Sequence, residues 1–255
     1  MPVLSIVTES PLRGAPVAVL DFETTGIDPG MRHPVQVAIC PLALGDAAST
    51  TWQTLIRPPC PIPPEATAVH GISDADVAQA PTWAEVEDEV LDRLDGRVLC
   101  AYNLPFDWTV LCEAMASGAR AAEAPAFGGL DPLVWAKLTD KYEKGKRLED
   151  VANRRGIQFA AHAAAADVGA TAAVMPLLLR QLAQEQHVRR PALDRLDHFW
   201  RWQLWAALMQ EREFREWRLR KGNSEPQLTW HPATGTSLDL PLERPTERPS
   251  ASPAR

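Results

Sequence analysis

The sequence contains no run of about 20 consecutive apolar residues, the length that a helix needs to span a bilayer. Near its start it places Glu9 and Pro11 where a secretory signal peptide would need an unbroken apolar stretch. We therefore expect a soluble, cytoplasmic protein with no membrane partner. The chain has 255 residues, 45% of them hydrophobic, which is enough to build a buried core.

The sequence also lacks an excess of positive charge. Asp and Glu number 33 against 26 Lys and Arg, which gives a formal charge of -7. This balance argues against a protein that holds nucleic acid through its overall charge. A nuclease is not excluded, because bound divalent cations would reverse the field of an acidic site.

Paired cysteines are missing as well. None of the four cysteines forms a C-x-x-C motif, so neither a zinc site nor a disulfide framework is expected. We predict reduced, buried thiols at Cys40, Cys60, Cys100 and Cys112.

Apolar runs bounded by turn residues predict three strands in series, at Val17–Phe22, Val35–Leu42 and Thr50–Ile56. A helix is expected from its cap Thr82 to Gly96, followed by a short buried strand at Val98–Tyr102. Strands in series favour an antiparallel start, and a strand after a helix adds a parallel element. We therefore predict an α/β fold with a mixed central sheet flanked by helices.

Three further segments have helical periodicity. They are Phe106–Ala116, then Arg147–Arg155, which Gly156 ends, and Ala163–Gln186, which we expect Pro176 to interrupt.

Composition divides the chain into four parts. Residues 1–15 form a lead-in without pattern, and 16–186 form the main domain. Residues 187–221 read as a Trp- and Arg-rich helical extension, and the Pro-rich tail at 222–255 is expected to be disordered. Three interpretations of the extension stay open: an amphipathic helix packed on the main domain, a contact for single-stranded nucleic acid, or a protein-binding surface.

Paired carboxylates stand at the end of the first predicted strand, in Asp21-Phe22-Glu23-Thr24-Thr25-Gly26. Residues two apart in a strand point to the same face, so Asp21 and Glu23 lie together while Phe22 faces the core. Adjacent carboxylates repel each other unless cations lie between them, and hard divalent ions prefer such oxygen ligands. The alternative is a solvated strand end.

Two more acidic motifs follow. Asp107, in Asn103-Leu104-Pro105-Phe106-Asp107, lies in the first turn of a helix, where it could cap the helix or reach a site at the sheet edge. His162 and Asp167 are five residues apart, a spacing that does not converge on one helix. We expect His162 in the loop before the helix and Asp167 on its inner face, although a lone His among alanines is often a plain surface residue.

In order and spacing these motifs resemble the DEDDh branch of the DnaQ-like 3′-to-5′ exonuclease superfamily, over about residues 16 to 183. The matching positions are Asp21 and Glu23 in DFETTG, Asp107 in NLPFD, and His162 with Asp167, supported by Thr67–Ile72 and Arg147–Ala152. The sister DEDDy branch has Tyr where this chain has Ala163, so the resemblance favours His162 as the base. Two departures are Tyr102, where many relatives have His, and Ala163, where many have Arg.

The resemblance implies an RNase H-like fold and two bound divalent ions, Mg²⁺ or Mn²⁺. The implied ligands are Asp21, which bridges the ions, Glu23 and Asp167 on the nucleophile side, and Asp107, acting partly through water. His162 would be the general base, since an imidazole titrates near neutral pH.

The resemblance also implies a pocket for the terminal nucleotide. Thr24, Thr25, His70 and Asn103 match positions that line it. Phe106 could stack on the terminal base, or it could be a core aromatic.

The expected function is removal of 5′-mononucleotides from the 3′ end of DNA, preferably single-stranded. Alternatives are an exoribonuclease of the same fold and a proofreading subunit associated with a polymerase. A non-catalytic module that keeps the fold and binds nucleic acid or protein is a third hypothesis from another class.

Overall fold

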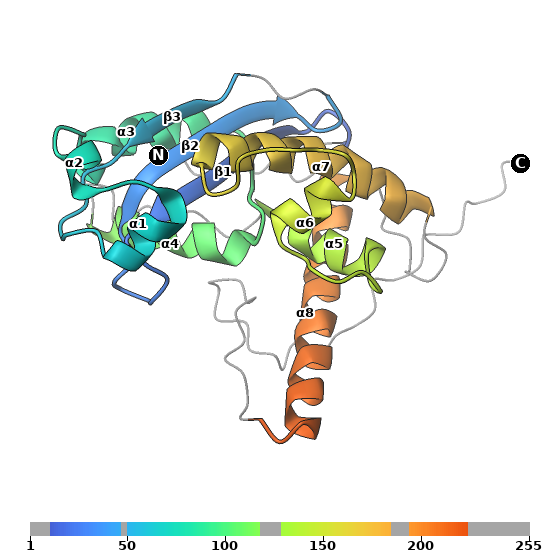
Figure 1. Cartoon of the computed structure of the whole chain (residues 1–255). Helices are drawn as coiled ribbons and strands as arrows, with labels where there is room; N and C mark the ends of the chain where they lie inside the picture. The colour runs from blue at the N-terminus through green and yellow to red at the C-terminus, as the bar shows by residue number, and fades with distance from the viewer. Residues whose placement is uncertain (1–10, 47–49, 118–128, 185–193, 224–255) are drawn as a thin grey trace, which may run out of the picture.

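The computed structural model describes residues 11–46, 50–117, 129–184 and 194–223 (Figure 1). Within these ranges five strands form one sheet in the order β3-β2-β1-β4-β5. The strands are β1 Pro16–Thr24, β2 Pro34–Ala43, β3 Trp52–Leu55, β4 Val98–Cys100 and β5 Gly129–Leu130. The first three pair antiparallel, whereas β4 is parallel to both β1 and β5. The predicted mixed sheet with an antiparallel start is confirmed.

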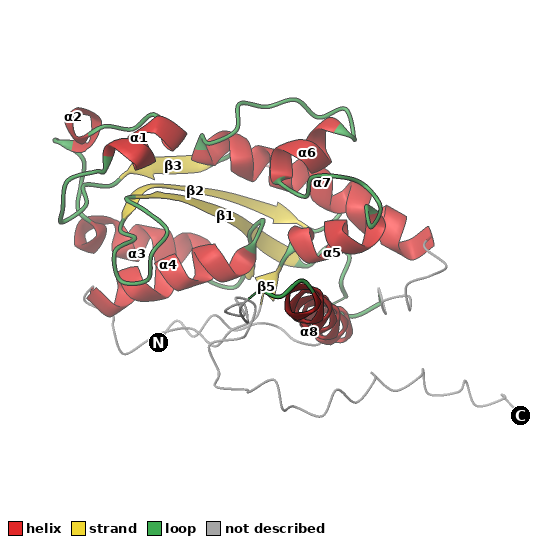
Figure 2. Ribbon diagram, turned by 60° about the horizontal axis from the view of Figure 1, so that its bottom comes forward, coloured by secondary structure: helices red, strands yellow, loops and turns green. Residues whose placement is uncertain are grey.

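Helices cover both faces of this sheet (Figure 2). α7 Ala164–Gln184 lies on one face, and α3 Trp83–Leu94 and α4 Leu104–Ser117 lie on the other. The other described helices are α1 Pro64–His70, α2 Asp74–Val77, α5 Pro132–Thr139, α6 Leu148–Asn153 and α8 Leu196–Arg220. Sequence analysis did not predict α1, α2, α5 or β5.

β1 is the central strand and positions the site. It pairs with β2 along its whole length and with β4 at its start. Val17, Val19 and Leu20 are fully buried, as expected for a strand covered on both faces. The register shifts between Glu23 and Thr24, so the regular ladder ends where the acidic motif ends.

Capping residues explain where two helices begin. The amide and hydroxyl of Thr82 both donate to the carboxylate of Glu85, which confirms the predicted start of α3. α1 begins with Pro64 in its first turn and ends at Gly71, which has the left-handed φ of 76° that glycine tolerates.

The predicted interruption at Pro176 is wrong, because α7 continues through it as one helix. Proline removes one N–H donor, at a cost of about 3 kcal/mol in an isolated helix. Here Val174, Met175 and Leu178 on either side of it are fully buried. Packing against the sheet therefore outweighs the local preference.

α8 docks through its first half. Phe199, Trp202 and Gln203 are buried. The Gln203 side chain accepts from the Asp131 amide at 2.9 Å and from the Trp135 ring N–H at 2.8 Å, and it donates to the carbonyl of Gly129 at 2.9 Å. These contacts bind the helix to β5 and α5.

The second half of α8 extends away from the sheet and its covering helices (Figure 1). Phe214, Trp217 and Leu219 are each about half exposed on it. Helical structure is thus found inside the predicted extension, while the division into 16–186 and 187–221 stays a prediction.

Residues 1–10 of the lead-in and 224–255 of the Pro-rich tail lie outside the described residues, so the expected disorder of the tail stays a prediction. No helix in the described ranges is long and apolar enough to cross a membrane. The four cysteines are free as predicted, but only Cys40 and Cys100 are buried, since Cys60 and Cys112 are half-buried.

Candidate active site

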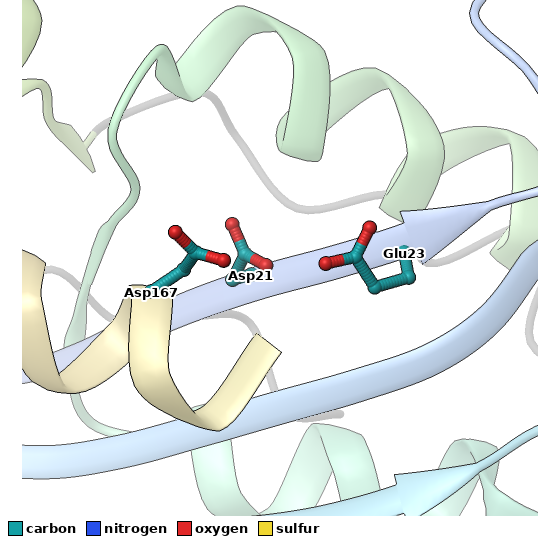
Figure 3. Close-up of side chains that lie close together, drawn as sticks. All are labelled: Asp21, Glu23 and Asp167. Carbon is teal, nitrogen blue, oxygen red and sulfur yellow. The ribbon is translucent and has the colours of Figure 1, made fainter. Parts of the chain in front are cut away.

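Three carboxylates converge at the carboxyl end of β1 (Figure 3). Asp21 and Glu23 come from β1 and Asp167 from the first turn of α7. One oxygen of each lies within 4.8 Å of the other two. Oxygens gathered at this spacing suit a hard divalent cation, which takes carboxylate ligands. The structure therefore brings together three of the four predicted ligands.

Strand alternation and a helix start hold this cluster. Asp21 and Glu23 pair with Ala38 and Gln36 of β2, so their side chains share one face. Phe22 points the other way and is 4% exposed. The Asp167 carboxylate accepts the backbone N–H of Ala163 at 3.1 Å, which fixes it at the start of α7.

The site carries more negative charge than its surroundings balance. Burial, and then the charges of Asp107, Asp167 and Glu23, raise the pKa of Asp21 well above its usual range. Burial and the charge of Asp167 raise the pKa of Glu23 to about 7. A divalent cation would relieve this repulsion and favour the ionised forms. The donor set and its electrostatics thus both fit a metal ion.

Asp107 lies behind the cluster, in the first turn of α4. It is 3% exposed, and one of its oxygens accepts the backbone N–H of Phe22 at 3.0 Å. Burial raises the pKa of Asp107, and its negative charge in turn raises the pKa of Asp21. Its oxygens are outside the group of three, a position compatible with the water-mediated role that the resemblance implied.

His162 lies at the rim, in the loop that precedes α7. Its side chain is exposed and its φ is 64°, a left-handed conformation that few residues other than Gly and Asn adopt readily. Its charge, when present, lowers the pKa of Asp167 and of His70. The loop position expected from its spacing to Asp167 is confirmed, whereas its role as base stays a prediction.

Two of the predicted pocket residues form hydrogen bonds within the turn after β1. The Thr24 hydroxyl donates to the carbonyl of Gly26 at 2.7 Å. The Thr25 hydroxyl donates to the carbonyl of Met31 at 2.8 Å and accepts the amide of His33 at 2.9 Å. These bonds close the loop between β1 and β2.

His70 connects α1 to the end of β1. Its Nδ1 accepts the amide of Ile72 at 3.0 Å, so Nε2 carries the proton and faces the carbonyl of Thr24 at 3.2 Å. Burial lowers the pKa of His70, which favours this neutral form.

Asn103 and Phe106 lie near the start of α4. Asn103 has a φ of 72°, and its backbone N–H donates to the carboxylate of Asp131 at 3.1 Å. Phe106 is half-buried, with the guanidinium of Arg32 5.9 Å from its ring centre. Both alternatives for Phe106, stacking and core packing, fit this position, and the pocket assignment stays a prediction.

Sequence analysis missed two groups that support the site. Asp131 accepts from both Asn103 and Leu133, and it thereby joins the starts of α4 and α5. An Asp directly before a Pro is a common start of a helix and was the available signal. Arg32 forms a bidentate ion pair with Glu113, at 2.9 and 3.0 Å, which fastens the β1–β2 loop to α4. Such a pairing between distant segments has no local sequence signal.

Comparison with known proteins identifies the family. An exonuclease family model, RNase_T, matches residues 18–175. The chain is 34% identical over 180 residues to a DNA polymerase III subunit epsilon-like protein of Rhodobacter capsulatus, and 30% identical over 159 residues to the 3′-5′ exonuclease DinG of Staphylococcus haemolyticus. The matches cover 70% and 62% of this chain. The chain spans only 25% and 17% of those two proteins.

Solved structures share the fold. Exonuclease X in complex with 5′ overhanging duplex DNA has a TM-score of 0.52 and 21% identity, over 72% of this chain and 99% of that one. Exonuclease I from Methylocaldum szegediense has a TM-score of 0.56 and 23% identity, over 79% and 45% of the two chains. The RNase H-like fold that the resemblance implied is confirmed. The chain therefore belongs to the exonuclease family described by RNase_T, within the DnaQ-like superfamily.

Proposed function

We propose that the chain is a 3′-to-5′ exonuclease that removes 5′-mononucleotides from the 3′ end of DNA, preferably single-stranded. The observation that carries this proposal is the convergence of Asp21, Glu23 and Asp167, with Asp107 directly behind them. Family membership supports nuclease chemistry at this place.

The proposed cofactor is a pair of Mg²⁺ or Mn²⁺ ions. Asp21, Glu23 and Asp167 would hold them directly, and Asp107 would act in part through water. When bound, two such ions stabilise the charge on the attacking and leaving oxygens of an in-line displacement at phosphorus.

His162 is the proposed general base. Its exposed imidazole at the rim can take the proton of the attacking water, and an imidazole is partly neutral at physiological pH. The bond between phosphorus and the 3′ oxygen of the preceding nucleotide breaks, which releases the terminal nucleotide with its 5′ phosphate.

DNA is the preferred substrate in this proposal because the relatives' names point to it. One is named as similar to a DNA polymerase subunit, and exonuclease X was solved with duplex DNA. A proofreading role beside a polymerase is the second candidate, and it rests on the name of the Rhodobacter capsulatus relative.

The test is digestion of one oligonucleotide labelled at either end, as DNA and as RNA, with Mg²⁺, Mn²⁺ or EDTA. We expect mononucleotide release from the 3′ end of DNA, dependent on the cation. Asp167→Asn should lose this activity, and the matched variant Asp92→Asn, which alters an exposed carboxylate of α3, should keep it. Cleavage that persists in EDTA, or that starts at the 5′ end, contradicts the proposal, and faster RNA digestion replaces DNA by RNA as the substrate.

A further inference from the structure

The loop between α5 and α6 concentrates the lysines of the protein. Three of the five lysines in the sequence, Lys141, Lys144 and Lys146, lie in this loop, and a fourth, Lys137, lies in the last turn of α5. Lys141, Lys144 and Arg147 are exposed, and Tyr142 between them is 91% exposed. In a chain of charge -7, this loop is a local basic surface with one carboxylate of its own, Glu143.

Hydrogen bonds from the Arg154 side chain hold the backbone of this loop. The Arg154 guanidinium donates to the carbonyls of Lys144 and Gly145, each at 3.0 Å, and to the carboxylate of Asp140 at 2.7 Å. Gly145 has a φ of 74°, and a Cβ there would collide with the Asp150 carboxylate. The carbonyls thus turn toward Arg154, while the cationic side chains are left at the surface.

The same loop is anchored to the segment that leads into α4. The hydroxyl of the half-buried Tyr102 donates to the carbonyl of Lys146 at 2.6 Å. Tyr102 follows β4 and directly precedes Asn103 and α4, the helix that carries Asp107. In Figure 1 the loop runs between α5 and α6, on the side of the sheet that α7 covers. One short segment, Tyr102–Asp107, thus connects the loop to the candidate active site.

Three cations of this loop differ from two cations of α8 in their ion pairs. None of the ion pairs between described residues involves Lys141, Lys144 or Arg147. On α8, by contrast, Arg212 and Arg220 both pair with Glu216. Among the described residues, Lys141, Lys144 and Arg147 are thus available to phosphate groups, whereas Arg212 and Arg220 already share a carboxylate.

We propose that the loop 141–147 binds the phosphate backbone of the substrate strand on the 5′ side of the nucleotide being removed. Lys141, Lys144 and Arg147 contact phosphates, and Tyr142 stacks on a base. This inference rests on the proposed function, since it assigns further contacts to the same substrate. The exonuclease site then holds the end of the strand, and the loop holds its continuation.

The test compares Lys141→Gln/Lys144→Gln with a matched control, Arg212→Gln/Arg220→Gln, which removes two cations from α8. Binding of a fluorescein-labelled 20-nucleotide single strand is followed by anisotropy in EDTA over a range of salt. Each lost phosphate contact lowers the slope of log K against log salt by about 0.7 for a single strand. We expect a fall of about 1.4 for the loop variant and none for the control.

A second measurement separates this inference from the proposed function. A dinucleotide has no continuation on its 5′ side for the loop to hold. With Mg²⁺ the loop variant should therefore cleave it at the wild-type rate while its KM for the 20-nucleotide strand rises. An unchanged salt slope in the loop variant, or a loss confined to the α8 control, overturns the inference and leaves the exonuclease proposal intact. Wild-type protein that binds the long strand with the expected slope but cleaves neither substrate overturns the proposed function alone.

Discussion

Neutralising Glu23 should stabilise the metal-free protein and weaken its response to metal. The pKa of Glu23 is raised from 4.5 to about 7, first by burial and then by the charge of Asp167. A carboxyl group whose pKa is raised by folding stabilises the native state while it is protonated. That contribution is present below pH 4.5 and is lost as the pH rises through about 7.

The size of the effect follows from this shift. At about 1.4 kcal/mol per pKa unit, the shift corresponds to at most ~3.5 kcal/mol. Water that enters the site screens the charge, so we expect about 1–2 kcal/mol at pH 8. For a protein of this length, that is a difference of roughly 3–6 °C in Tm.

The assay is thermal unfolding of wild-type protein and Glu23→Gln, from pH 6 to 8.5, in EDTA and in Mg²⁺. In EDTA at pH 8 the variant should have the higher Tm, and the gap should close toward pH 6. In Mg²⁺ the wild type should gain more, because it keeps the third carboxylate ligand. Comparing Glu23→Gln with the wild type cancels the opposite pH dependence of His70, whose lowered pKa destabilises the native state as the pH falls.

An exposed glutamate serves as the control, since Glu213→Gln on α8 removes the same charge away from the site and should leave the Tm unchanged. If Glu23→Gln is less stable than the wild type in EDTA at pH 8, the reasoning from charge repulsion is refuted.

Three further predictions concern single residues. His162→Asn retains a residue that tolerates a positive φ, so the Tm should not move while turnover falls about 10²- to 10⁴-fold, measured on labelled DNA. Asp107→Asn keeps an oxygen that can accept the Phe22 amide but loses the negative charge. Folding should therefore persist, while activity or metal affinity drops roughly 10- to 100-fold. An unaltered cleavage rate would exclude Asp107 from the site. Gln203→Leu leaves three buried polar groups without their hydrogen-bond partner. Urea denaturation should show a loss of about 3 kcal/mol or more in the free energy of unfolding. A smaller loss would mean that α8 docks by apolar packing alone.

The parts of the site that sequence analysis predicted are those set by local geometry. The alternation of a strand was enough to put Asp21 and Glu23 on one face. The spacing of His162 and Asp167 was enough to place the histidine in a loop. Both arguments need only a few adjacent residues.

Other features depend on segments far apart in the chain. Asp107 bonds to Phe22, 85 positions away, and no local pattern reports that contact. β5 has two residues and α5 has eight, too few for periodicity to distinguish them from loops. The prediction for Pro176 was wrong because it used only the local preference of proline to break a helix. Burial of the neighbouring residues of α7 against the sheet outweighs that preference.

The position of β1 between β2 and β4 also bears on the order of folding. β2 follows β1 closely in the chain, so this hairpin closes a short loop, whereas pairing of Val17 with Val98 closes a long one. We therefore expect Asp21 and Glu23 to be placed early, and Asp107 and Asp167 to arrive late, when their charges oppose docking. Refolding in EDTA should then have a slow final phase at pH 8 that Mg²⁺ accelerates, so that the proposed metal ion would also assist the assembly of its own site.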